Sequence, residues 1–157
     1  MVLGAEIMKI MYIIFLFLLA ACSYASASKN IIDKASLFSY SFQIEEKNEQ
    51  CFLIHDAHRK PLVPKPPCYF IRESDQKLKY FSYNDVGIDA VLIVIGTAVS
   101  DDMRAEWGLD ENLVCGTEAQ GILIKKYEIL VTKKVLTDGL LCRNTGADEK
   151  NFWEFAH

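Results

Sequence analysis

One pair of neighbouring residues has the side chains that acid–base catalysis needs, His55 and Asp56. A histidine oriented by a carboxylate can activate a serine or cysteine nucleophile. The chain has no G-x-S-x-G sequence, in which such a serine commonly lies, and the pair stands where a strand is expected to end. An exposed loop histidine is the more common explanation. We therefore predict no catalytic residue, and a small hydrolase is the least favoured alternative.

Adjacent carboxylates occur at Asp101–Asp102, Asp110–Glu111 and Asp148–Glu149. A glycosidase holds its two carboxylates on opposite sides of the scissile bond, whereas sequence neighbours on a strand or loop point apart. These pairs are therefore predicted to be solvated loop charges, which also suit an inhibitor that faces a basic cleft. The glycines lack the spacing of a phosphate-binding loop, so no cofactor is predicted.

The five cysteines divide into one near the N-terminus and four farther along the chain: Cys22, Cys51, Cys68, Cys115 and Cys142. An even number of cysteines in an exported domain is typical of disulfides. No two cysteines form a C-x-x-C pair, and the only closely spaced histidines are His55 and His58. We therefore predict two disulfides and no metal site.

Four cysteines allow three pairings, and the sequence leaves the choice open. The pairing that we favour closes the shortest loops and joins Cys51 to Cys68 and Cys115 to Cys142. Each such bridge would stabilise the fold by about 3 kcal/mol in the chain-entropy account. A simple hairpin of residues 51–55 and 68–72 would place Cys51 opposite Arg72 rather than Cys68. The first bridge therefore requires an irregular or crossing connection.

The N-terminal segment has the layout of a secretory signal. Residues 10–21 are apolar without a charge and follow Lys9. This run fits a signal peptide, whose apolar region needs about 7–15 residues, and is short of the roughly 20 residues of a membrane span. We predict a signal peptide over residues 1–21, with translation beginning at Met8.

Two processing sites compete at the end of this segment. Leu19-Ala20-Ala21-Cys22 is typical of a bacterial lipobox, in which Cys22 receives the lipid, and the several acyl chains of a lipoprotein anchor stably. Ala25-Ser26-Ala27 is the alternative, an ordinary cleavage site that would release a soluble periplasmic protein. We favour lipidation at Cys22, because it directly follows the apolar run. In lipoproteins of Gram-negative bacteria, a residue other than Asp after the lipidated cysteine implies sorting to the outer membrane, and the resemblance to their lipobox gives Ser23 this meaning. Residues 22–35 are then expected to form a tether.

Removing 21 of the 157 residues leaves 136, which suits one domain, expected over residues 36–157. The net charge of −4 and the lack of a basic stripe with interleaved aromatics argue against a nucleic-acid partner. Strands are expected in segments that alternate in polarity or form short apolar runs. These segments are 38–44, 51–54, 68–71, 77–83, 90–98, 121–125 and 128–132. Residues 68–71 and 77–83 are expected to form one hairpin, and residues 121–125 and 128–132 a second one around a turn at Lys126 and Tyr127.

The most apolar of these segments, residues 90–98, is expected at the centre of the sheet. The proline-rich loop that follows residue 55 is predicted to lie outside the sheet, since proline cannot donate to a ladder. Ser100 or Asp101 should cap a short helix that ends at Gly108, and the aromatic residues 152–155 should pack on the sheet. The predicted class is mainly β: a compact antiparallel sheet, sandwich or barrel-like, with one or two short helices and two disulfides.

The C-terminal third, over residues 114–122, 142–146 and 148–155, resembles small lipoproteins encoded beside type VI secretion effectors. Those proteins are immunity factors, among them partners of phospholipase effectors. The resemblance implies that the protein partner is a secreted effector toxin, neutralised in the periplasm. An inhibitor of lysozyme and a pilotin-like assembly lipoprotein are the alternatives.

The resemblance gives no contact residues. Candidates come instead from the proline-rich loop over residues 56–67 and the acidic segment over residues 101–111. The candidate contact residues are His58, Arg59, Lys60, Asp101, Asp102, Asp110 and Glu111.

Overall fold

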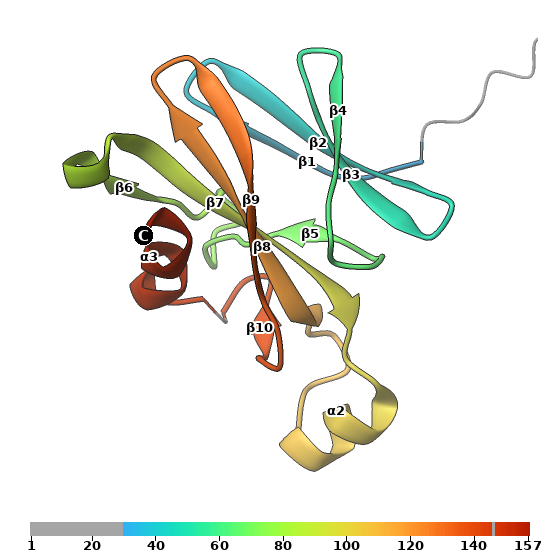
Figure 1. Ribbon diagram of the computed structural model, residues 1–157. Coiled ribbons are helices and arrows are strands. Elements are labelled where there is room, and N and C mark those ends of the chain that lie inside the picture. The colour runs from blue at the N-terminus through green and yellow to red at the C-terminus, as the bar shows by residue number, and fades with distance from the viewer. Residues whose placement is uncertain (1–29, 146) are drawn as a thin grey trace, which may run out of the picture.

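The computed structural model describes residues 30–145 and 147–157 (Figure 1). The predicted signal peptide, the predicted lipidation site at Cys22 and the alternative cleavage site predicted at Ala27 lie outside these residues. The strands of the described part are β1 (Asn30–Leu37), β2 (Tyr40–Lys47), β3 (Gln50–His55), β4 (His58–Pro61), β5 (Tyr69–Phe70), β6 (Phe81–Tyr83), β7 (Ile88–Ala98), β8 (Cys115–Lys125), β9 (Glu128–Leu136) and β10 (Leu141–Cys142). The helices are the 3-10 turn η1 (Asn84–Val86), α2 (Asp101–Trp107) and α3 (Glu149–Ala156).

The first four strands form one antiparallel sheet in chain order, β1-β2-β3-β4. Two-residue turns join them, and several turn residues have positive φ: 54° at Phe38, 51° and 58° at Asn48 and Glu49, and 43° and 63° at Asp56 and Ala57. Paired positive φ angles are typical of the hairpin turns that match the twist of the strands. Tight turns therefore fix the register of this sheet.

The second sheet has the order β10-β8-β7-β5, with β6 also pairing with β7 and β9 with β8. The prediction that residues 90–98 lie at the centre is confirmed, because β7 is flanked by β8 on one edge and by β5 and β6 on the other. Alternate side chains of β7 point to opposite faces, and both faces are covered. Its continuous apolar run follows from this double burial.

Two apolar cores lie on the two faces of the second sheet. The core between the sheets includes Phe42, Ile44, Leu53, Leu62, Phe70, Leu92 and Ile122. The core beneath α3 includes Ile71, Ile88, Val91, Ile93, Ile95, Phe152 and Phe155. Figure 1 shows α3 packed against the second sheet, and α2 at the far end of the molecule from the turns β1–β2, β3–β4 and β8–β9. The mainly β, antiparallel, sandwich-like class predicted from the sequence is confirmed.

Both helices begin at side-chain caps. Ser100 accepts a hydrogen bond from the Met103 amide and Gly108 ends α2 in the left-handed conformation, as predicted. The packing of the C-terminal aromatic segment on the sheet is also confirmed. This segment is the helix α3, which begins with a capping box between Asp148 and Asn151.

Both favoured disulfides are present. Cys51, in β3, is bonded to Cys68, just before β5, so this bridge joins the two sheets through their common core. Cys115 and Cys142 lie directly opposite each other in β8 and β10. The crossing connection expected between the first two cysteines is thus the passage of the chain from one sheet to the other.

The expected tether over residues 22–35 is too long, because β1 already begins at Asn30 and pairs with β2. The polar residue Asp33 breaks the apolar pattern of this strand, yet its side chain is buried. Arg72 and Arg143 approach its carboxylate to 2.8 and 3.0 Å. The last part of the expected tether is therefore a strand, and the ion pairs of Asp33 with Arg72 and Arg143 hold this strand against the second sheet.

The prediction that the proline-rich loop lies outside the sheet is wrong for its first part. β4 pairs with β3, and Pro61 is its last residue, opposite Phe52. Proline is tolerated there because β4 is an edge strand. The expected hairpin of residues 68–71 and 77–83 is reduced to one bridge, between Arg72 and Leu78, and β6 pairs with β7 instead.

Candidate protein-binding surface

The basic residues proposed for partner contact lie on the edge strand β4, and two of them are used within the fold. The Arg59 guanidinium lies 3.6 Å from the centre of the Phe52 ring and 3.6 Å from the Glu45 carboxylate. Lys60 donates a hydrogen bond to the carbonyl of Ile129, across the open side of the sandwich. His58 is exposed. The charged groups of Arg59 and Lys60 therefore already make contacts within the fold, which leaves them only partly available to a partner.

The acidic residues proposed for contact lie at the other end of the molecule. Asp101 and Asp102 form the first turn of α2, and Asp110 and Glu111 follow that helix. All four are exposed, and Asp110 accepts hydrogen bonds from the amide and side chain of Asn112. Figure 1 places α2 far from the turn that precedes β4. The structure therefore does not bring the basic and acidic candidates together.

His55 and Asp56 do contact each other, with 3.1 Å between Nε2 and the carboxylate. The His55 ring packs against Tyr40 and Phe42, with ring centres 5.4 Å apart in both pairs. Its Nδ1 is buried and has no hydrogen-bond partner among the described residues. The ring is thus held as part of the packing at the end of β3, and nothing in these contacts supplies a nucleophile.

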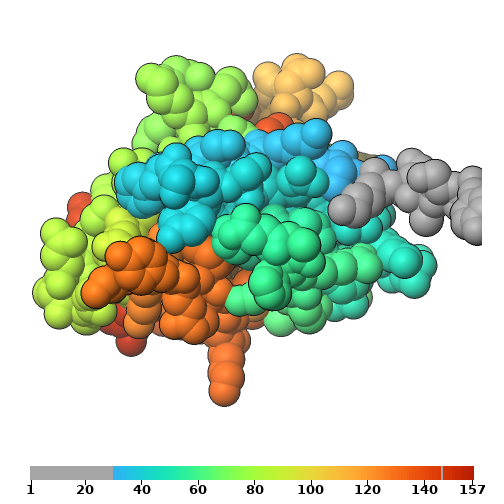
Figure 2. Space-filling model, turned by 90° about the horizontal axis from the view of Figure 1, so that it is seen from above, coloured from blue at the N-terminus to red at the C-terminus, as the bar shows by residue number. Residues whose placement is uncertain are grey.

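An open groove lies at the end of the sandwich where β1–β2 and β8–β9 turn. We call it the turn-end groove; its volume is about 490 Å³. The lining residues are Phe38, Ser39, Tyr40, Asn84, Asp89, Ile124, Lys126 and Tyr127. Figure 2 looks onto this end and shows the turns β1–β2, β3–β4 and β8–β9 gathered on one face.

Aromatic side chains at this end stand in solvent. Tyr127 is 86% exposed and Phe38 is 61% exposed. Phe38 packs edge-on against Tyr80, itself 40% exposed, with ring centres 5.8 Å apart. Single exposed apolar side chains are common on protein surfaces, whereas several that lie side by side form the kind of patch that marks a binding site.

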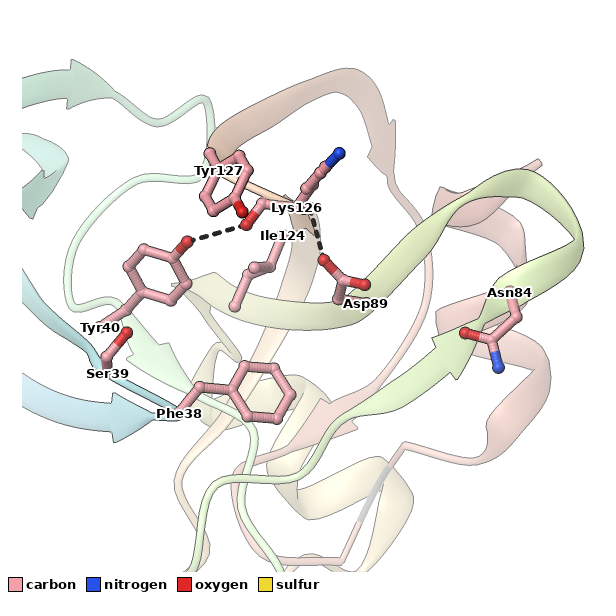
Figure 3. Close-up of a pocket in the computed structure, with 8 residues that line it drawn as sticks. All are labelled: Phe38, Ser39, Tyr40, Asn84, Asp89, Ile124, Lys126 and Tyr127. Atoms are coloured by element: carbon pink, nitrogen blue, oxygen red, sulfur yellow. Dashed lines mark hydrogen bonds between the residues drawn. The ribbon is translucent and has the colours of Figure 1, made fainter.

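Hydrogen bonds hold the walls of the turn-end groove together. The Tyr40 hydroxyl donates to the Lys126 carbonyl over 3.3 Å, and the Lys126 amide donates to the Asp89 carboxylate (Figure 3). These bonds link one sheet to the β8–β9 turn and that turn to the start of β7. The groove is therefore a fixed shape between the two sheets.

No helix in the described ranges is long and apolar enough to cross a membrane. Among the same residues, no cluster of histidine, cysteine, aspartate and glutamate has the arrangement of a metal site.

Comparisons with models of protein families, with curated proteins and with solved structures found no match. The resemblance to immunity lipoproteins therefore stays a prediction, and function has to be inferred from the geometry.

None of the groove residues was among the contact residues predicted from the sequence. The pattern of residues 38–44 placed Phe38 in a strand, whereas it is a turn residue with φ of 54°. Lys126 and Tyr127 were predicted to form a turn, and a tyrosine at a hairpin turn was the available signal. No local pattern in the sequence shows that the β1–β2 turn and the β8–β9 turn meet, because the residues that join them, Tyr40 and Lys126, are 86 positions apart.

Proposed function

We propose that this protein is an envelope lipoprotein that binds and neutralises a toxic effector protein in the periplasm, and that it holds this partner at the turn-end groove. The observation that carries the proposal is the set of exposed aromatic rings around that groove, led by Phe38 and Tyr127. Aromatic side chains dominate the energetic centres of protein interfaces, because they bury a large area at a small cost in side-chain entropy.

The rigidity of the fold also supports a binding role. A disulfide joins the two sheets, and short hairpin turns carry the aromatic rings. A partner therefore meets a surface that loses little conformational freedom on binding, which favours tight association. An inhibitor must remain bound while its target is active, and a rigid binding surface favours the slow dissociation that this requires.

The identity of the partner rests on the predicted export and on the resemblance of the C-terminal third to immunity lipoproteins. An inhibitor of lysozyme or a pilotin-like assembly lipoprotein would use a different partner. Both alternatives remain within the class of envelope binding proteins, and the same surface would serve them.

The test is a binding measurement between the purified protein and the secreted effector encoded beside its gene. We expect Phe38→Ala and Tyr127→Ala each to weaken binding at least about tenfold, as for interface hot spots. Trp107→Ala is the matched control, since Trp107 is 42% exposed at the α2 end and should leave binding unchanged.

Each other outcome is informative. Absence of binding to the neighbouring effector overturns the immunity proposal. Equal affinity of all three variants would place the partner elsewhere on the molecule. Sedimentation with lipid vesicles, lost in Phe38→Ala and Tyr127→Ala, would assign the aromatic rings to a membrane surface instead of a protein.

A further inference from the structure

We infer that the turn-end groove receives a guanidinium side chain, an arginine that the partner protein presents. This inference rests on the proposed function and adds the chemistry of the contact. Its basis is the combination, in one groove, of an apolar floor, aromatic walls and a single carboxylate.

The Phe38 and Tyr127 rings, which are 61% and 86% exposed, suit the aliphatic part of a long side chain, and Ile124, 1% exposed, closes the floor behind them. Ile124 lies between the Tyr40 ring and Asp89 in Figure 3, with Phe38 across the groove from the β8–β9 turn. Long cationic side chains bury their methylene groups against such apolar surface while the charged head reaches a polar partner. Aromatic faces additionally attract the flat guanidinium group.

Asp89 supplies the charge on the opposite wall. It is exposed, and one oxygen of its carboxylate accepts a hydrogen bond from the Lys126 amide. Among the described residues, no hydrogen bond or ion pair engages its second oxygen, and Ser82 bonds only to its backbone carbonyl. The carboxylate is therefore held in place with one oxygen left for a ligand.

Lys126 is the nearby cation that could neutralise Asp89 without a partner. Its side chain points away from Phe38 and Tyr40 in Figure 3. The ammonium lies 5.7 Å from the centre of the Tyr127 ring, and no ion pair joins it to Asp89 in the described part of the chain. Lys126 also lines the groove, but no ion pair in the described part of the chain engages the Asp89 carboxylate. An arginine is favoured over a lysine because its planar group can stack on a ring and bond the carboxylate at the same time.

The first arm of the test needs no partner. N-acetyl-arginine amide is titrated into the full protein and followed by NMR, beside the citrulline analogue, which has the same shape without the charge. We expect the arginine probe to shift the amides of Phe38, Asp89 and Lys126, and the citrulline probe to bind at least about threefold more weakly, as befits a solvated charge pair.

Asp89→Asn is the informative variant, because its amide oxygen can still accept from the Lys126 amide while the charge is lost. It should weaken binding of the arginine probe at least about threefold and should also weaken the effector complex. Asp138→Asn is the matched control, because Asp138 is an exposed carboxylate between β9 and β10, at the end of β8 away from the groove, and it should change neither.

The outcomes separate this inference from the proposed function. Equal binding of the arginine and citrulline probes, or an Asp89→Asn variant with the wild-type affinity for the arginine probe, overturns the inference. If Phe38→Ala still weakens the effector complex in that case, the proposed function stands. If Phe38→Ala leaves the complex intact while the arginine probe binds at Asp89, the groove is a cation site and the proposed docking surface is wrong.

Discussion

At the scale of single residues, Asp33 has the most demanding environment among the described carboxylates. It is 6% exposed, and it accepts hydrogen bonds from both Arg72 and Arg143 and from the Phe70 amide. Removing one partner of a buried ion cluster leaves uncompensated charge. Because Arg72 and Arg143 follow β5 and β10 of the second sheet closely in the chain and Asp33 belongs to the first sheet, this cluster fastens β1 to the rest of the fold.

Asp33→Ala is therefore expected to lower the free energy of unfolding by about 3–5 kcal/mol, the usual cost of breaking a buried pair. Asp75→Asn is the control, because Asp75 pairs with Lys77 in solvent and should leave stability unchanged. Urea denaturation of both variants measures the difference. A loss below about 1 kcal/mol for Asp33→Ala, the range of exposed pairs, would show that the cluster does not fasten the sheets.

Tyr83 gives the molecule a pH dependence at alkaline pH. Burial, followed by the nearby charges of Glu149 and Asp85, raises the pKa of the Tyr83 hydroxyl above its ordinary value. The hydroxyl also donates to the Glu149 carbonyl over 3.1 Å. The folded protein thus holds this proton more tightly than the unfolded chain, so stability falls as pH rises past about 10, the ordinary tyrosine pKa.

Tyr83→Phe should cost about 1 kcal/mol below pH 9 through the lost hydrogen bond, and its stability should fall less steeply than that of the wild type above about pH 10. Urea midpoints measured at several pH values test both parts. Parallel curves for the two proteins across this range would contradict the assignment to Tyr83.

At the scale of elements, the sequence predicted those strands, caps and turns whose structure depends mainly on their own residues. The run of β7, the Ser100 and Gly108 caps of α2 and the turn between β8 and β9 are of this kind. β1 was missed because distant residues, Arg72 and Arg143, pair with its Asp33. β4 was missed because its proline, Pro61, argued against a strand, although an edge strand tolerates proline. The helical state of α3 was missed although Asp148 and Asn151 have the spacing of a cap.

Close packing of α3 on the sheet depends on Gly121 in β8. A Cβ atom there would lie 2.6 Å from Cγ of Phe155. Gly121→Ala should therefore displace α3 and cost about 1–3 kcal/mol, as overpacked sites do. Gly139 has nothing within 4 Å of the same added atom, so Gly139→Ala is the control.

Thermal unfolding of the two alanine variants compares them directly. We expect a lower midpoint for Gly121→Ala and a nearly unchanged one for Gly139→Ala. Equal midpoints would mean that Phe155 can move without loss, and that α3 is a loosely attached element.

At the scale of the whole molecule, the sequence predicted the sandwich class and both disulfides, but not the turn-end groove that we propose as the binding surface. The groove is assembled from the β1–β2 turn, the start of β7 and the β8–β9 turn, and no local pattern records that these meet. The predicted contact residues were charged loop residues. The structure instead gathers exposed aromatic rings, whose exposure depends on the packing of both sheets.

The arrangement of β1 also sets which way the groove faces. The described chain enters β1 at Asn30, which pairs with Glu46 beside the β2–β3 turn, whereas the groove lies at the other end of the strand. Eight residues of strand span roughly 26 Å. An anchor attached through the residues before Asn30 would therefore leave the groove pointing away from the point of attachment.

Bulky labels distinguish the two ends. A polyethylene glycol chain on Glu49→Cys, in the β2–β3 turn, should leave effector affinity unchanged, because that turn lies beside Asn30 at the end of β1 away from the groove. The same label on Ser39→Cys, which lines the groove, should abolish binding by steric exclusion. Loss of binding with the Glu49 label alone would place the partner at the end of the sandwich where β1 begins, and the turn-end groove would not be the docking surface.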